Sequence, residues 1–145
     1  MPKLFNNMVT SKDCIKKYGL PELQKNLKLF DVPAKLEIGV IPKRIYCNID
    51  IIEPLTKAFE ALINTEAVKE LVTWDGCFNI RKKRINDTYS LHSWGVAIDI
   101  NAFENQMGTS GKLSQKFVKC FIDNGFDWGG NWTLKDPMHF QLTKI

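Results

Sequence analysis

The fold of this chain is organised around residues 90–99, which read SLHSWGVAID. The only two histidines of the sequence are His92, in this stretch, and His139, near the end of the chain. Each has an aspartate close by, since Asp99 follows His92 and Asp136 precedes His139. Two imidazoles and one carboxylate provide the three protein ligands of a catalytic zinc ion, whose fourth position stays open for water. The remaining carboxylate is then available as the general base that takes a proton from that water.

The residues alone leave two interpretations of this pattern open. A histidine among hydrophobic residues is usually a hydrogen-bonded core or surface group that binds no metal. In favour of a metal site, residues 95–101 alternate two sets of side chains, Val96, Ile98 and Ile100 against Ala97, Asp99 and Asn101. This alternation predicts a strand with one apolar face and one face that carries a carboxylate. A partly buried carboxylate is costly without a partner or a metal, and a bend at Trp94-Gly95 would let His92 approach it.

The composition predicts one globular domain of an ordinary kind. A chain of 145 residues is long enough for a single core, and its hydrophobic fraction of 44% and charged fraction of 25% are typical. The net charge is +4, and the densest basic run is confined to residues 81–84. Such a short run favours a solvated loop, so no nucleic-acid partner is expected. No apolar stretch approaches the length of a membrane span, so no insertion into a membrane is expected either.

The four cysteines are far apart and form no CxxC pair: Cys14, Cys47, Cys77 and Cys120. An even number would allow two disulfides in an oxidising compartment. However, the sequence opens with polar residues and not with a charged and then apolar secretory segment. We therefore expect free, mostly buried thiols in a protein that is made in the cytoplasm. If its substrate lies outside the membrane, another factor must deliver it.

Local patterns in the first third of the chain predict helices and then an extended segment. Residues 1–35 are expected to form a helical lead-in, in which Ser11 is a candidate N-cap of a short helix that Gly19 ends. Pro21 would open a second short helix, with an apolar side formed by Leu23, Leu27 and Phe30. Residues 36–47 look extended.

The rest of the chain predicts two amphipathic helices and several short strands. The first helix begins after Asn48 or Asp50, and its apolar stripe consists of Leu55, Ala58, Phe59, Leu62 and Ile63. The second helix lies near residues 113–122 and ends close to Gly125. Strands are expected within residues 73–80, 95–101 and 138–142. Together these elements predict an α+β fold in which helices cover a small antiparallel sheet.

The motif residues resemble those of a known family. The pattern SxHxxGxAxD over residues 90–99, followed by DxxH over residues 136–139, resembles the signature of the M15 peptidases. This family comprises zinc D-Ala-D-Ala carboxypeptidases and dipeptidases, and L-alanyl-D-glutamate endopeptidases used as bacteriophage endolysins. The resemblance extends over about residues 72–142. It implies a Hedgehog/DD-peptidase-like α+β fold and a single peptidase domain, residues 1–145, whose metal-site core is residues 72–142.

The resemblance also implies the metal ligands and the group that transfers protons. His92, Asp99 and His139 match the ligands of one zinc ion. Asp136 matches the catalytic acid/base, a position at which some relatives have glutamate. The three ligands and the acid/base are the same four residues that the chemistry of the motif singles out.

Other site positions are implied in the same way. Arg81 is the best match for the arginine that stabilises charge on the substrate carbonyl, and Arg84 is the runner-up because loop lengths vary before the motif. Ser90 is expected close to the metal, where it bonds either the substrate or a group that supports a ligand. Trp128 is a candidate for substrate binding, although the tryptophans of this region are explained equally well as core residues.

These expectations combine into a zinc metallopeptidase, a peptidoglycan hydrolase that cleaves the stem peptide. The specific expectation is a phage-type endolysin with L-alanyl-D-glutamate endopeptidase activity. One alternative is a D-Ala-D-Ala carboxypeptidase or dipeptidase. Another is a non-catalytic module of the same fold that binds the cell wall or forms part of a phage particle. We expect a monomer that acts on the cell wall after release from the cytoplasm.

Overall fold

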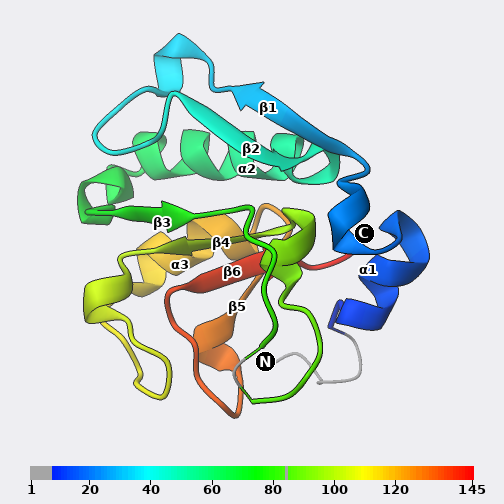
Figure 1. Cartoon of the computed structure of the whole chain (residues 1–145). Coiled ribbons are helices and arrows are strands. Elements are labelled where there is room, and N and C mark those ends of the chain that lie inside the picture. The colour runs from blue at the N-terminus through cyan, green and yellow to red at the C-terminus, as the bar shows by residue number, and fades with distance from the viewer. Residues whose placement is uncertain (1–7, 84) are drawn as a thin grey trace.

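The computed structural model describes residues 8–83 and 85–145 and has the expected α+β architecture (Figure 1). The helices and strands are, in chain order, α1 (Ser11–Tyr18), β1 (Leu27–Asp31), β2 (Arg44–Asn48), α2 (Ile49–Asn64), β3 (Trp74–Gly76), β4 (Ala97–Ile100), α3 (Gln115–Ile122), β5 (Phe126–Trp128) and β6 (His139–Leu142). Short 3-10 helices lie between them, at Pro21–Leu23, Ala34–Leu36, Ala67–Glu70, Leu91–Trp94, Ala102–Glu104 and Gly129–Asn131.

The strands form two antiparallel sheets, with α2 between them in the view of Figure 1. β1 and β2 make a two-stranded sheet, and the other strands make a four-stranded sheet in the order β3-β4-β6-β5. β4 and β6 are the inner strands of the larger sheet, and their register places Asp99 opposite His139. The fold therefore brings two of the predicted site residues together by strand pairing alone.

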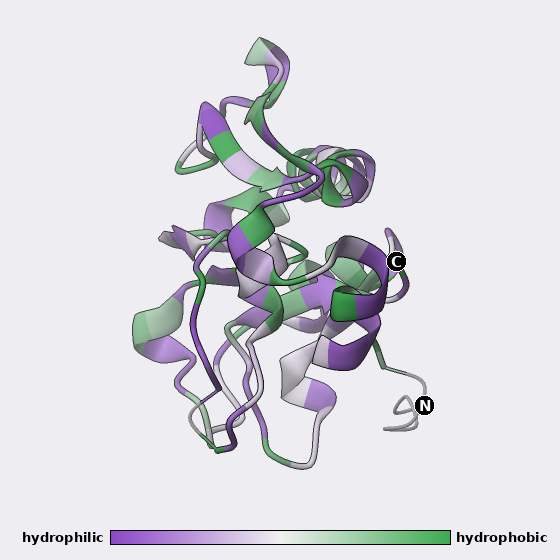
Figure 2. Cartoon of the chain, turned by 45° about the vertical axis from the view of Figure 1, so that its right-hand side comes forward, coloured by the Kyte–Doolittle hydropathy of each residue, from purple (hydrophilic) through white to green (hydrophobic). Residues whose placement is uncertain are grey.

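The central helix, α2, forms as the sequence predicts. Asn48 is its N-cap, and the side chain accepts a hydrogen bond from the Asp50 N–H at 2.9 Å. The buried face consists of Ile51, Leu55, Ala58, Phe59 and Leu62. Figure 2 shows this helix almost end on, beside the two-stranded sheet of β1 and β2. Neither α2 nor any other helix in the described residues is long and apolar enough to cross a membrane.

The other amphipathic helix, α3, packs aromatic side chains against the strand that carries His139. The Oγ of Ser114 caps α3 by accepting a hydrogen bond from the Phe117 N–H at 3.1 Å. Phe121 stacks on Phe140 with ring centroids 4.5 Å apart, and both side chains are fully buried. Burial of two such rings fixes β6 against α3. Because adjacent strand residues point to opposite faces, His139 is turned away from this core.

The lead-in differs from the expectation in two respects. The N-cap of α1 is Thr10 and not Ser11, because Thr10 and Asp13 exchange side-chain and backbone hydrogen bonds in a capping box. Residues 27–31 form the strand β1 and not part of a second helix. Pairing with β2 along the whole length of β1 outweighs the helical spacing of its apolar residues. Gly19 ends α1, as predicted.

The extended segment predicted for residues 36–47 is only half correct. Strand β2 begins at Arg44, whereas the preceding residues contain the 3-10 helix Ala34–Leu36 and a turn. Gly39 has a φ of 61° in this turn, a conformation that ends any extended run. Residues 1–7, the start of the predicted lead-in, lie outside the described part of the chain.

Candidate metal centre

His92 is presented by the 3-10 helix Leu91–Trp94, which lies between the basic loop and β4. Ser90 caps this turn, and its Oγ accepts a hydrogen bond from the His92 N–H at 3.3 Å. Gly95 ends the turn in the left-handed region with a φ of 68°. A Cβ at this position would lie 2.8 Å from the backbone nitrogen of Asn48. The predicted bend is therefore confirmed, and it requires glycine for both its φ and its close packing.

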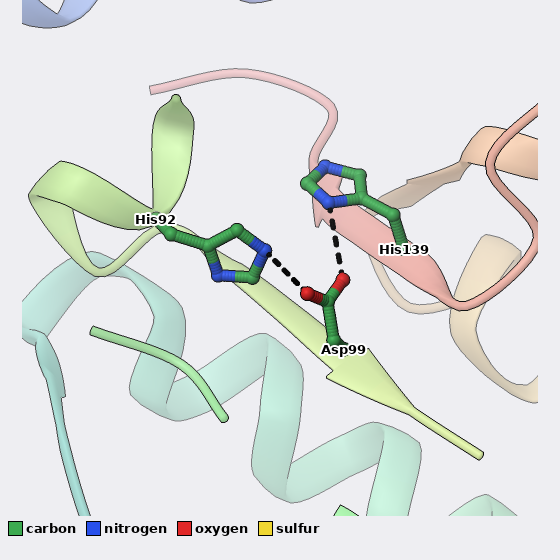
Figure 3. Close-up of side chains that lie close together, drawn as sticks. All are labelled: His92, Asp99 and His139. Atoms are coloured by element: carbon green, nitrogen blue, oxygen red, sulfur yellow. Dashed lines mark ion pairs between the residues drawn. The ribbon is translucent and has the colours of Figure 1, made fainter. Parts of the chain in front are cut away.

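The structure brings His92, Asp99 and His139 together (Figure 3). Asp99 Oδ2 lies 3.1 Å from His92 Nε2, and Asp99 Oδ1 lies 3.4 Å from His139 Nδ1. One candidate ligand atom from each residue lies within 4.8 Å of the other two. Both imidazoles are buried, and their ring centroids are 5.1 Å apart. The three predicted ligands thus form one cluster in space.

Two polar atoms of this cluster have no hydrogen bond. His92 Nε2 and Asp99 Oδ1 are buried and lack a hydrogen-bond partner among the described residues. Burying such atoms without a partner is costly, so a structure that tolerates it needs an explanation. A bound cation explains both atoms at once, because each offers a lone pair to it. Two imidazole nitrogens and one carboxylate oxygen are a donor set that suits zinc.

Hydrogen bonds on the outer side of each imidazole select the nitrogen that faces Asp99. The Nδ1–H of His92 donates to the carbonyl oxygen of Cys77 at 2.7 Å, so its Nε2 is left as the acceptor. The Nε2–H of His139 donates to Oε1 of Gln141 at 2.9 Å, so its Nδ1 is left as the acceptor. Partners of this kind orient metal-binding imidazoles and fix their tautomers.

Burial and neighbouring groups act in opposite directions on the ionisation of this cluster. Burial alone would raise the pKa of Asp99, but the adjacent imidazoles of His139 and His92 outweigh it and hold that pKa well below its usual range. Burial alone would lower the pKa of His139, but Asp99 outweighs it and the pKa of His139 is raised. The aspartate is therefore ionised at neutral pH, as a metal ligand must be.

Asp136 lies beside the cluster, in the loop that leads into β6. Its backbone N–H donates to the carbonyl of Gly129 at 2.9 Å, and its carbonyl accepts a hydrogen bond from the His139 N–H at 3.0 Å. The loop passes so close to Gly129 that a Cβ there would lie 2.2 Å from the carbonyl oxygen of Asp136. The glycine-rich turn before the motif therefore serves to seat Asp136 next to a metal ligand.

The carboxyl of Asp136 is partly buried, and burial raises its pKa above the usual range. Asp99 acts in the same direction, whereas the charges of His139, His92 and Arg81 oppose it. The carboxyl is thus within electrostatic range of the whole cluster. No hydrogen bond or ion pair holds it among the residues that the structure describes. A carboxyl with a raised pKa beside a candidate metal site is suited to proton transfer.

Arg81 is anchored to the His92 turn through its backbone. The Arg81 N–H donates to Oγ of Ser93 at 3.1 Å, and the Arg81 carbonyl accepts a hydrogen bond from the Ser90 N–H at 2.9 Å. The side chain of Arg81 is exposed. Its positive charge acts on Asp136 and partly opposes the rise in the pKa of that carboxyl. The predicted alternative, Arg84, lies outside the described residues.

The two predicted substrate-binding residues both have structural contacts. Ser90 is buried, and its hydroxyl caps the turn that carries His92. This contact agrees with the second of its two expected roles, that of supporting a ligand. The indole N–H of Trp128 donates to the carbonyl of Pro137 at 2.8 Å, so this side chain holds the loop next to Asp136. A role of either residue in binding substrate stays a prediction.

Two residues at the site were not found from the sequence. They are Cys77, whose carbonyl orients His92, and Gln141, which orients His139. Trp132, one of the tryptophans for which the sequence left a site role and a core role open, has its ring centroid 5.2 Å from that of His139. A backbone carbonyl that orients a side chain cannot be recognised in the sequence, because every residue has one. Gln141 could have been recognised, because it follows His139 by two residues in a strand and must lie on the same face.

Comparison with known proteins agrees with this geometry. Residues 84–142 match the model of a family described as D-alanyl-D-alanine carboxypeptidase, within the M15 peptidases. The matched segment contains the whole His92, Asp99 and His139 cluster and also Asp136. Comparisons with curated proteins and with solved structures gave no significant match. The matched segment and the cluster within it support an M15 family peptidase.

Proposed function

We propose that this chain is a zinc-dependent peptidase that cleaves the stem peptide of peptidoglycan. The observation that carries the proposal is the cluster of His92, Asp99 and His139, with its unpartnered buried atoms and with Asp136 beside it. The match of residues 84–142 to the model of a peptidase family supports the reaction class. We assign one zinc ion to the cluster, because its three side chains supply the ligand number of a catalytic zinc site.

The residues around the cluster have distinct roles in the proposed reaction. When bound, zinc lowers the pKa of water and polarises the scissile carbonyl. Asp136 takes a proton from the attacking water and later gives it to the leaving amine, for which its raised pKa is suited. Arg81 provides a positive donor where negative charge develops on the carbonyl oxygen. Ser90 and Trp128 hold the segments on which His92 and Asp136 are presented.

Within this class we favour an L-alanyl-D-glutamate endopeptidase of the phage endolysin type. The support is the resemblance of the two motifs, including aspartate rather than glutamate as the acid/base. A D-Ala-D-Ala carboxypeptidase is the second candidate, and the description of the matched family favours it. In either case we propose a single peptidase domain that works as a monomer on the cell wall after its release.

The proposal is tested by digesting purified peptidoglycan of several wall types and identifying the fragments by mass spectrometry. Digestion is run with a chelator, without it, and with zinc added back. New amino termini at D-glutamate identify the endopeptidase, whereas free D-alanine identifies the carboxypeptidase. A matched control is Asp136→Asn, which should release neither product.

The same experiment distinguishes an enzyme from a module that only binds. A non-catalytic cell-wall or phage structural module would bind to the walls and yield no metal-dependent product. If no wall type yields a product although the protein carries one zinc ion per chain, the proposed peptidase activity is excluded. The chain would then be a non-catalytic module of the same fold.

A further inference from the structure

Gln141 is a buried polar residue that the proposed reaction does not use directly. It lies two residues after His139 on the same face of β6, and only 4% of its surface is exposed. Its Oε1 lies 2.9 Å from Nε2 of His139. Its own Nε2 donates a hydrogen bond to the carbonyl oxygen of Val9 at 3.3 Å. The side-chain amide therefore bridges a candidate metal ligand and the N-terminal segment.

The contact with Val9 decides which way the amide of Gln141 points. A backbone carbonyl can only accept, so the NH2 group faces Val9 and Oε1 faces His139. The amide oxygen also can only accept, so the proton of the neutral imidazole lies on Nε2 of His139. Nδ1 of His139 then has a free lone pair and faces Asp99 at 3.4 Å.

Two acceptors compete for this one proton. Asp99 is a charged acceptor, and on its own it would draw the proton to Nδ1 of His139, where the proton would block a metal. Gln141 opposes this shift, because a proton on Nδ1 would leave the Nε2 lone pair pointing at Oε1 in a buried place. The tautomer of His92 is fixed independently, by the backbone carbonyl of Cys77.

We propose that Gln141 is a positioning residue of the metal centre. Its amide, oriented by Val9, keeps the proton on Nε2 of His139 and leaves Nδ1 free to bind the metal. The proposal rests on the metal site of the proposed function. It also gives the N-terminal segment a defined task, because the backbone of that segment orients the amide.

The test determines by NMR the tautomers of the two imidazoles in metal-free, full-length protein labelled with nitrogen-15. Because the chain has only two histidines, long-range proton–nitrogen correlation spectra contain two ring systems. Spectra are recorded well above the ordinary imidazole pKa of about 6.5. We expect Nε2–H for His139 and Nδ1–H for His92. The opposite tautomer of His139 in the wild-type protein overturns the proposal without the need for a variant.

Two substitutions then distinguish the effect of the amide oxygen of Gln141 from the effect of the volume of its side chain. Gln141→Met removes the acceptor at similar volume, so it should move the proton of His139 toward Nδ1. Zinc binding, measured by competition with a chromophoric chelator, should weaken by roughly ten- to a hundredfold. Gln141→Glu retains an acceptor and should keep Nε2–H. The control is Gln24→Met, because Gln24 is exposed and its side chain accepts a hydrogen bond, within the described part of the chain, only from Tyr46.

An unchanged tautomer and unchanged zinc affinity in Gln141→Met would overturn the proposal. So would a loss of Nε2–H in Gln141→Glu equal to that in Gln141→Met. None of these measurements depends on hydrolysis of peptidoglycan. A failure of this proposal is therefore distinguishable from a failure of the proposed function.

Discussion

Asp99 and His139 lie directly opposite each other on β4 and β6, with Asp99 Oδ1 3.4 Å from His139 Nδ1. Their relative position is set by the backbone register of the two inner strands of the sheet. His92 joins them from a 3-10 turn that Ser90 caps and Gly95 ends. The sheet thus fixes two of the proposed ligands, and the turn places the third beside them.

We expect His92→Ala and His139→Ala to lose stoichiometric zinc. Each substitution removes one of three protein ligands, and the remaining two cannot hold zinc in a tetrahedral site. Zinc per chain is measured by elemental analysis after gel filtration and should fall from about one to a small fraction. Asp87→Asn, in the exposed loop before the motif, is the control and should retain the metal. Unchanged zinc content in either histidine variant would contradict the ligand assignment.

Asp136→Asn should retain zinc and lose most of the turnover. The side chain is not one of the three ligands, so its loss leaves the metal in place. An amide cannot take up the proton that a carboxylate accepts, and the loss of general acid–base catalysis lowers kcat by about a hundred- to ten-thousandfold. The measurement is zinc content together with the rate of product release from peptidoglycan. A variant with zinc and near-full activity removes Asp136 from the mechanism.

The cluster of His92, Asp99 and His139 could be predicted from the sequence because its residues are few and chemically distinct. Two histidines, each with a nearby aspartate, leave little choice of ligands, and the alternation around Asp99 places the carboxylate on a strand. The long helix could be predicted for a similar reason. Asn48 is a strong N-cap, and the apolar stripe after it has the helical period.

Non-local pairing could not be predicted in the same way. β1 is a strand because β2 lies beside it, and the spacing of Leu23, Leu27 and Phe30 by itself fits a helix. The groups that orient the imidazoles depend on tertiary structure as well. Every residue has a carbonyl, so nothing in the sequence singles out Cys77 as the partner of His92.

Arg81→Ala should lower kcat by about a hundred- to a thousandfold, the usual effect of removing one donor to a developing oxyanion. Zinc content should not change, because Arg81 contacts the site through its charge and not as a ligand. Arg81→Lys should retain part of the rate, since it keeps the charge but loses the planar fork.

The control for this variant is Arg44→Ala. Arg44 forms an exposed ion pair with Asp31 at 2.9 Å in the β1–β2 hairpin, and such pairs contribute little. Its removal should leave turnover at the wild-type level. Near-wild-type turnover of Arg81→Ala would exclude Arg81 and make Arg84 the residue to test.

The cysteine thiols should react slowly in the folded protein. All four cysteines are buried and none is in a disulfide. Burial raises the pKa of Cys14 and of Cys47 to about 12, and it raises the pKa of Cys77 well above its usual range. Only the thiolate is nucleophilic, so at pH near 8 modification of these groups should be roughly a thousandfold slower than in urea.

The measurement is the reaction of a chromogenic disulfide reagent with native and with urea-unfolded protein. Unfolded protein should react rapidly at four thiols per chain. Rapid reaction of Cys14, Cys47 and Cys77 in the native protein would show that this part of the core opens readily. Fewer than four thiols after unfolding would show a disulfide.

The pairing of Asp50 with α1 predicts a loss of stability in acid. Asp50 Oδ2 accepts a hydrogen bond from the Tyr18 hydroxyl at 2.5 Å and lies 3.1 Å from the Lys17 ammonium. Burial alone would raise the pKa of Asp50, but these two groups outweigh it and the pKa is lowered. The folded state thus favours the carboxylate more than the unfolded chain does. This contribution is complete above the unfolded pKa of about 3.9 and is lost as the pH falls through the lower folded pKa.

Asp50→Asn should therefore destabilise the protein at pH 7 and have little effect below the folded pKa of Asp50. The asparagine cannot form the ion pair, and we expect a decrease of about 1 kcal/mol in the free energy of unfolding at pH 7. The free energy of unfolding in urea is measured on metal-free variant and wild-type protein across the acid range, and the difference between them is taken at each pH. The titration of His92, Asp99 and His139 affects both proteins and cancels in this difference. Asp31→Asn, which breaks the exposed pair with Arg44, should show a much smaller difference. If the difference for Asp50→Asn is the same at every pH, the effect comes from packing and not from the charge of Asp50.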